Sequence, residues 1–128
     1  MALKRDLFLG FVKLHILYHA GRDAFYGLWL IDELRRHGYE LSPGTLYPML
    51  HSLEREGYLA AERQVIQGKV RKYYRLTPEG QGALAQGRGQ AVELLRELYE
   101  DEGGLPPKGA DHGEPPPRDP DDGRRGDR

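Results

Sequence analysis

Two short segments with helical spacing of apolar residues lie close together in this sequence, and they constrain the fold more than any other feature. One runs from about Ala24 to His37 and the other from Ser42 to Gly57. Gly38 ends the first, because glycine is common just past a helix. Ser42-Pro43 starts the second, because serine is a good N-cap and proline suits the first helical position. Two helices joined by so short a turn predict a helix-turn-helix. The expected core face of the first helix consists of Leu30, Ile31 and Leu34.

Pro48 lies inside the second segment, where a proline removes a backbone hydrogen bond and clashes with the preceding turn. The cost is small if the regular helix begins with Thr45 as its N-cap, because Pro48 then falls in the first turn. We therefore expect an irregular entry from Ser42, followed by a regular helix from Thr45.

A β-hairpin is expected after these helices, with strands at 58–66 and 70–76 joined by Gln67-Gly68. An amphipathic helix ending near Gly21 precedes them, and Thr77-Pro78 begins a last helix. The predicted fold class is mostly α with a small β-hairpin, a winged helix-turn-helix plus a C-terminal dimerisation helix.

The chain divides into three parts by composition. Residues 1–76 form the expected DNA-binding domain, 77–102 the C-terminal helix and 103–128 a disordered tail, in which Leu105 is the only large aliphatic residue. No apolar run is long enough to span a bilayer, and the N-terminus does not resemble a signal peptide. The absence of cysteine excludes disulfides and thiolate metal sites. We expect a soluble, cytoplasmic protein without a cofactor or membrane partner.

The charge is distributed unevenly, although the net charge is only −1. Acidic residues gather between Glu93 and Glu102, whereas basic residues gather in the expected hairpin. A near-neutral protein with one basic edge can still hold a phosphate backbone. The bases of the hairpin are Arg63, Lys69, Arg71, Lys72 and Arg75.

Four motifs resemble the PadR family of transcriptional regulators: YGLWLIDEL at 26–34, LSPGTLYPML at 41–50, LEREGYL at 53–59 and RKYYRLTPEG at 71–80. They occur in the family's order and spacing, and the resemblance covers roughly residues 5–100. The single C-terminal helix is similar to that of the family's shorter branch, which dimerises through this helix. The resemblance implies a homodimeric repressor whose DNA affinity falls when a small molecule or ion binds.

DNA contacts are expected from the second helix of the pair and from the hairpin tip. Short polar side chains near a helix N-terminus meet base edges in the major groove, and basic residues of a wing reach phosphates or the minor groove. Three alternatives stay open. Ser42 and Thr45 could serve only as helix caps, and Tyr47 could pack on the preceding helix. The charges of the hairpin could serve only to keep its edge strands soluble. The predicted contacts with double-stranded operator DNA are Ser42, Gly44, Thr45, Tyr47, His51, Ser52, Lys69, Arg71 and Lys72.

An apolar stripe on the last helix predicts a homodimer, because a lone C-terminal helix cannot bury the stripe against its own small domain. The N-terminal helix is expected to complete the interface. The predicted interface residues are Leu3, Leu7, Phe11, Leu84, Ala91, Leu95 and Leu98.

The effector site is the least defined part of the sequence. His15 and His19 have the i, i+4 spacing of two metal ligands. No nearby carboxylate or cysteine in the same helix completes the set, so we predict no metal and a histidine pair that packs near the dimer interface. Trp29 lies off the core stripe. It either lines an aromatic pocket at the dimer interface or simply seals that interface, and we favour the second alternative.

Two other functions compete with DNA-binding regulation. The serines, Ser42 and Ser52, lack the context of a catalytic nucleophile, and no phosphate loop or HExxH motif occurs, so we predict no enzyme. The stronger alternative is a winged-helix protein-interaction module without DNA binding. The basic hairpin favours a DNA-binding transcriptional regulator that represses its own or an adjacent operon.

Overall fold

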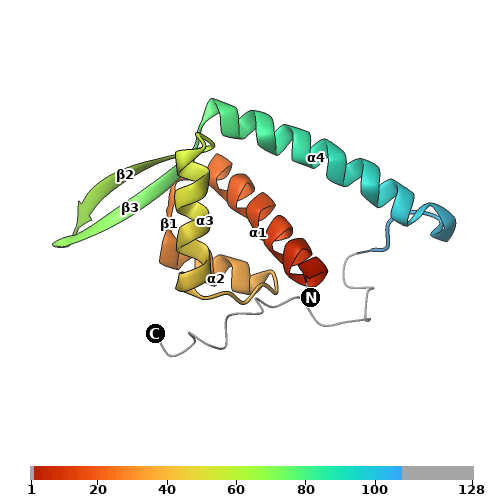
Figure 1. Ribbon diagram of the computed structural model, residues 1–128, viewed down its shortest axis with the longest axis horizontal. Helices are drawn as coiled ribbons and strands as arrows, with labels where there is room; N and C mark the ends of the chain where they lie inside the picture. The colour runs from red at the N-terminus through yellow and green to blue at the C-terminus, as the bar shows by residue number, and fades with distance from the viewer. Residues whose placement is uncertain (1, 108–128) are drawn as a thin grey trace.

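The computed structural model describes residues 2–107, which form four helices, a three-stranded antiparallel sheet and a short 3-10 helix (Figure 1). The predicted fold class, mostly α with a small β-hairpin, is confirmed, and the hairpin is part of a three-stranded sheet. Most of the predicted tail, residues 108–128, lies outside the described residues. No helix of the described part has the length and apolar content needed to cross a membrane. The elements are α1 (Ala2–Arg22), β1 (Phe25–Tyr26), α2 (Gly27–Arg36), α3 (Pro43–Arg55), β2 (Leu59–Ile66), β3 (Lys69–Leu76), α4 (Pro78–Leu98) and the 3-10 helix (Glu100–Glu102).

The core lies where α1, α2, α3 and the base of the sheet meet. Each helix contributes residues from one face at helical spacing, and the predicted core face of α2 is confirmed. Burying one such aliphatic side chain stabilises the fold by about 1.5–3 kcal/mol. The core side chains that are almost completely buried are Phe8, Val12, Ile16, Leu30, Leu34, Leu46, Leu50, Leu59 and Tyr74.

The start of α2 differs from the prediction, because the residues expected in its first turn form a strand instead. Phe25 and Tyr26 make β1, which pairs antiparallel with β3 opposite Tyr74 and Tyr73. Aromatic residues suit a half-buried strand, and the Phe25 ring lies 6.1 Å from the Tyr74 ring between centroids. Packing across the sheet therefore outweighs helix formation here, and the hairpin becomes part of a sheet of order β1-β3-β2.

The start of α3 also differs: the predicted irregular entry is wrong. The helix begins at Pro43 with Ser42 as N-cap, and the backbone N–H groups of Thr45 and Leu46 both donate to the Ser42 carbonyl at 3.0 Å. Pro48 consequently lies in the helix interior. Both Pro48 and Gly44, whose carbonyl loses its partner, are on the exposed side of α3, so water can replace the missing bond.

The hairpin of β2 and β3 pairs in register from Leu59 opposite Leu76 to Ile66 opposite Lys69. Its turn residues have positive φ angles, 51° at Gln67 and 79° at Gly68. A type I′ turn requires this geometry at both central positions, and glycine adopts it without steric cost. Residues 62–70, which include the turn, are exposed, and the tip of the hairpin projects past the helices (Figure 1).

The start of α4 matches the predicted cap. The Thr77 hydroxyl oxygen accepts a hydrogen bond from the Gly80 N–H at 3.0 Å and donates to the Gly57 carbonyl at 2.6 Å. Gly80 is packed so closely that a Cβ there would collide with the Tyr58 carbonyl. These contacts anchor the first turn of α4, whereas its C-terminal half extends past the other elements (Figure 1).

Candidate nucleic-acid interface

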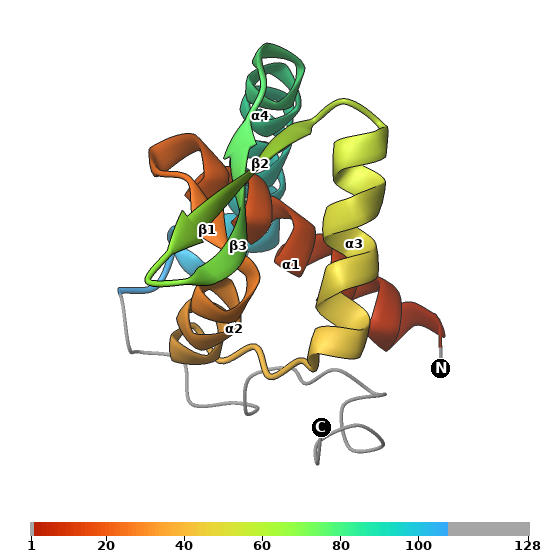
Figure 2. The same cartoon turned by 90° about the vertical axis from the view of Figure 1, so that its left-hand side faces the viewer.

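The exposed side of α3 is held in place by the leucines on its opposite side. Leu46, Leu50 and Leu53 are buried in the core, while Pro48, His51 and Arg55 stay exposed. Figure 2 looks onto the hairpin end of the molecule and shows α3 standing beside the two long strands. A helix fixed on one side and open on the other, next to a projecting hairpin, has the geometry that enters a major groove.

The polar residues predicted on α3 lie at different depths. His51 is exposed, Thr45 is half-buried and Ser52 accepts a hydrogen bond from Arg55 Nη2 at 3.1 Å. Arg55 was missing from the predicted site, although it follows His51 by four residues and therefore shares its face. An arginine there adds a donor suited to guanine or phosphate.

Ser42 and Tyr47 are structural residues in the free chain. Ser42 is 3% exposed, and its hydroxyl lies 3.4 Å from Thr45 Oγ1 without capping the helix. Tyr47 packs on the first residue of α2, so closely that a Cβ at Gly27 would collide with its ring. Burial, with the nearby Tyr74, raises the pKa of Tyr47. The geometry therefore favours the packing alternative for Tyr47, and the Gly44 backbone is the exposed group at the helix start.

The three predicted bases of the hairpin have different surroundings. Lys69 is exposed at the tip, whereas the Arg71 guanidinium lies 4.2 Å from the centroid of the Tyr26 ring. Lys72 Nζ lies 3.0 Å from Glu54 Oε1 on α3, and the hydrogen bond to this carboxylate raises the pKa of Lys72. Lys72 thus links the hairpin to α3 in the free chain, and Lys69 has the most open position.

Arg63 is a basic residue that the predicted site did not include. It lies opposite Lys72 in the register of β2 and β3 and is exposed. Opposite residues of an antiparallel pair point to the same face, so Arg63 shares the face on which Lys72 reaches α3. Arg63 follows Leu59 and Ala61 at two-residue steps and therefore lies on the same face of β2, and this strand period was the available sequence signal.

Most of the residues predicted for a dimer interface are exposed on the described chain. Leu3, Leu7 and Phe11 of α1 and Leu95 and Leu98 of α4 are all solvent-accessible. The prediction omitted two further exposed residues of α4, Val92 and Leu94. The others, Leu84 and Ala91, are half-buried and line an open pocket of about 310 Å³ together with Phe11, Leu14 and Leu95.

The weak effector candidates lie close together. The His15 and His19 rings are stacked with centroids 6.1 Å apart, and Trp29 is edge-on to His19 at 5.7 Å. Trp29 also stacks on Phe25 and lines an open pocket of about 590 Å³ with His19 and Tyr73. The residues around this pocket come from α1, β1, α2 and β3, so its aromatic lining fits the pocket alternative for Trp29.

A compact set of three helices with a three-stranded sheet, whose long hairpin projects beside the third helix, defines the winged helix-turn-helix class. The family model for the transcriptional regulator PadR-like family matches residues 16–86. The chain is 52% identical over 87 residues to Transcriptional regulator Rv3488 of Mycobacterium tuberculosis, covering 68% of this chain and 81% of that protein. It is 46% identical over 61 residues to Transcriptional activator GvpE1 of Halobacterium salinarum, covering 46% of this chain and 30% of that protein.

Solved structures give the same result. A PadR family transcriptional regulator from Eggerthella lenta is 34% identical, with a TM-score of 0.67 over 74% of this chain and 84% of that one. The chain belongs to the PadR-like family of transcriptional regulators. The named relatives are regulators of transcription rather than enzymes.

Proposed function

We propose that this regulator binds double-stranded operator DNA as a homodimer in the cytoplasm and represses its own or an adjacent operon. The observation that carries the proposal is the open side of α3 next to the basic hairpin. The N-terminal half of α3 would enter the major groove, where Thr45 and His51 reach base edges. Lys69 and Arg71 would then bind the flanking phosphates and fix the register without reading sequence.

The exposed apolar side chains of α1 and α4 support the homodimer. A row of such residues on one side of a small domain marks an interaction surface. A second copy of the chain offers the same residues, so the two surfaces bury each other around a two-fold axis. Two copies of α3 would then read half-sites about 34–36 Å apart, one turn of B-DNA.

Release by an effector is supported by two of the open pockets beside α1. One lies against α4 and the other against α2, and His37 lines both. A small molecule or ion bound there would touch the helix pair that reads DNA or the helices that hold the dimer. We expect the effector to bind the DNA-free chain more tightly than the DNA-bound chain. Only such a difference in effector affinity can change the affinity for DNA.

A gel shift with the DNA upstream of the protein's own gene tests the proposal. We expect binding at least about 1,000-fold tighter than to random DNA, weakening strongly between two salt concentrations. Equal affinity for both DNAs would contradict specific recognition of an operator in the DNA upstream of the gene. No DNA binding at low salt would refute DNA recognition altogether.

The alternative function, a protein-interaction module, has one observation in its favour. Lys72 is paired with Glu54 and Arg71 is stacked on Tyr26, so two of the hairpin bases already have partners. The same gel shift separates the two functions, because an interaction module leaves both DNAs unbound.

A further inference from the structure

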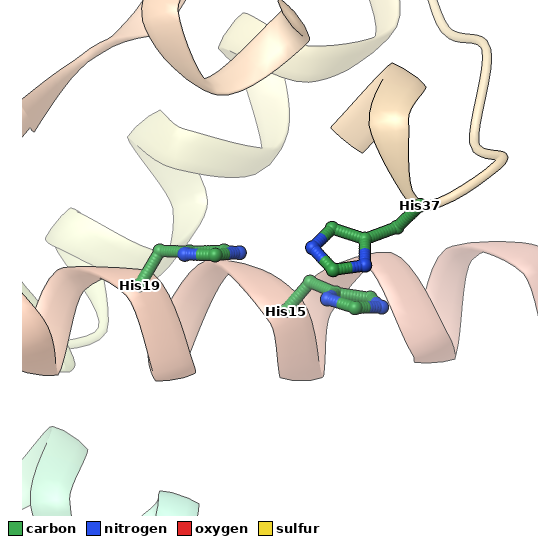
Figure 3. A group of neighbouring side chains, drawn as sticks. All are labelled: His15, His19 and His37. Carbon is green, nitrogen blue, oxygen red and sulfur yellow. The ribbon is translucent and has the colours of Figure 1, made fainter. Parts of the chain in front are cut away.

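Three histidines from two helices meet beside the helix-turn-helix. His15 and His19 lie one turn apart on α1, and His37 is the C-cap of α2 (Figure 3). The fold brings one ring nitrogen of each to within 4.8 Å of the others. The His15 and His37 rings are closest, with centroids 5.0 Å apart. The position of His37 is maintained by its backbone N–H, which donates to the Leu34 carbonyl at 3.0 Å.

A carboxylate lies beside two of these histidines. Glu33 lies one turn before His37 on α2, and its Oε2 is 3.2 Å from His37 Nε2 and 3.9 Å from His19 Nε2. Ligands around a tetrahedral zinc ion are separated by roughly 3.3–3.5 Å, given metal–ligand bonds of about 2.0–2.1 Å. The other carboxylate oxygen accepts from Arg36 Nη1 at 3.1 Å, and this arginine is exposed and free to move away.

Two members of the cluster are withdrawn from solvent, since His15 is half-buried and His19 is buried. This burial lowers the pKa of both rings; His37 lowers it further, whereas the Glu33 carboxylate raises it. His19 is 8% exposed, and its buried Nε2 has no hydrogen-bond partner among the described residues. Buried polar atoms are nearly always paired, so this one requires an explanation.

We propose that His15, His19 and His37, with Glu33 as fourth ligand, bind a divalent transition-metal ion of the zinc class. Imidazole nitrogens suit zinc, cobalt, nickel and copper, whereas magnesium and calcium require oxygen ligands. Binding would bring the nitrogens from within 4.8 Å of one another to the roughly 3.3–3.5 Å spacing of ligands around a coordinated ion. The ion reaches the cluster through the open pockets, because His15 lines the one beside α4 and His19 the one beside α2.

The ion would join α1 to the end of α2. Since α2 is the first helix of the helix-turn-helix and α1 packs against α4, the site lies between the DNA-reading part and the expected dimer helices. A change in DNA affinity on ion binding is the expected consequence. That consequence rests on the proposed function, whereas ion binding itself does not.

Titration of the chelator-treated full chain with Zn²⁺, followed by calorimetry, tests the site. We expect one ion per chain, with affinity lowered at least about 100-fold in His37→Ala and about 10–100-fold in Glu33→Gln. The matched control is His51→Ala, which removes an exposed histidine of α3 outside the cluster and should bind like the wild type. His37 is exposed, so the fold of its variant is expected to persist, and circular dichroism checks this.

A second readout uses the single tryptophan of the chain. Trp29 lies beside His19, so Co²⁺ or Cu²⁺ in the site should quench its fluorescence in the wild type and not in His37→Ala. Equal Zn²⁺ affinity of the wild type and His37→Ala, or uptake of Zn²⁺ no tighter than of Mg²⁺, would overturn the proposal.

A gel shift with and without Zn²⁺ then distinguishes the site from its consequence. A shift that changes with Zn²⁺ in the wild type but not in His37→Ala supports the regulatory role. If Zn²⁺ binds and the shift is unchanged, the regulatory role is wrong while the site stands. If no DNA binds under any condition, the proposed function fails, and the calorimetric result on the site is unaffected.

Discussion

Helices α3 and α4 both carry leucines at helical spacing, but only those of α3 are buried within the chain. Leu46, Leu50 and Leu53 are 0, 0 and 8% exposed, whereas Leu95 and Leu98 are 39 and 60% exposed. The same pattern thus has two uses. The buried leucines fix the orientation of the surface expected to read DNA, and the exposed ones form an apolar surface on α4 that is expected to pack against a second copy of the chain.

The largest effect is expected at the core of α3. Leu50→Ala should lower the free energy of unfolding by about 2–5 kcal/mol, because the cavity left beneath α3 cannot close fully. Urea unfolding at a fixed protein concentration measures this. The control Val65→Ala removes an exposed side chain of the hairpin and should change stability by less than about 0.5 kcal/mol. Similar losses in the two variants would contradict the assignment of the core.

The next prediction concerns the exposed leucines of α4. Leu95→Asp should raise the dimer dissociation constant by about 100-fold or more, because a carboxylate in an apolar interface is costly. Sedimentation at micromolar concentration should show dimers for the wild type and monomers for the variant, with an unchanged circular dichroism spectrum. Gln86→Asp, on the polar side of the same helix, is the matched control. A monomeric wild type would refute the dimer.

The exposed side of α3, opposite its buried leucines, is expected to read the base sequence of the DNA. His51→Ala should reduce the difference in binding free energy between operator and random DNA by about 1–3 kcal/mol per half-site, with little change in the salt dependence of binding. The fold should be unaffected because His51 is exposed. Competition gel shifts measure the ratio of the affinities for operator and random DNA, with Gln86→Asp as control. Equal weakening on both DNAs would instead place His51 against the phosphate backbone.

The smallest effects are expected on the hairpin. Lys69→Ala should weaken binding to all DNA sequences alike. It should also lower the magnitude of the slope of log affinity against log salt by roughly 1 per contact. Lys72→Ala should have a smaller effect, because Lys72 must first leave Glu54. Glu54→Gln sharpens the test, since freeing Lys72 should steepen the salt dependence. A larger effect of Lys72 than of Lys69 would show that the ion pair opens readily on DNA.

Local signals were sufficient for most of the fold. Positive φ at Gly38, Gly57 and Gly68, and the cap formed by Thr77, depend on residues adjacent in the chain, so the ends of helices and the hairpin turn were predictable. The failures lie where distant segments compete with local preference. Phe25 and Tyr26 join β3 rather than the helix that follows them, because the sheet offers more buried contact.

The candidate sites show the same division. The i, i+4 spacing of His15 and His19 was sufficient to place both on one face of α1. Only the tertiary structure placed His37 and Glu33 of α2 beside them, just as it paired Lys72 with Glu54. Spacing along one helix is fixed by its pitch, whereas contacts between two helices depend on how their buried faces pack. Sequence periodicity therefore identified most members of the helices and of the hairpin, and packing decided which of them meet.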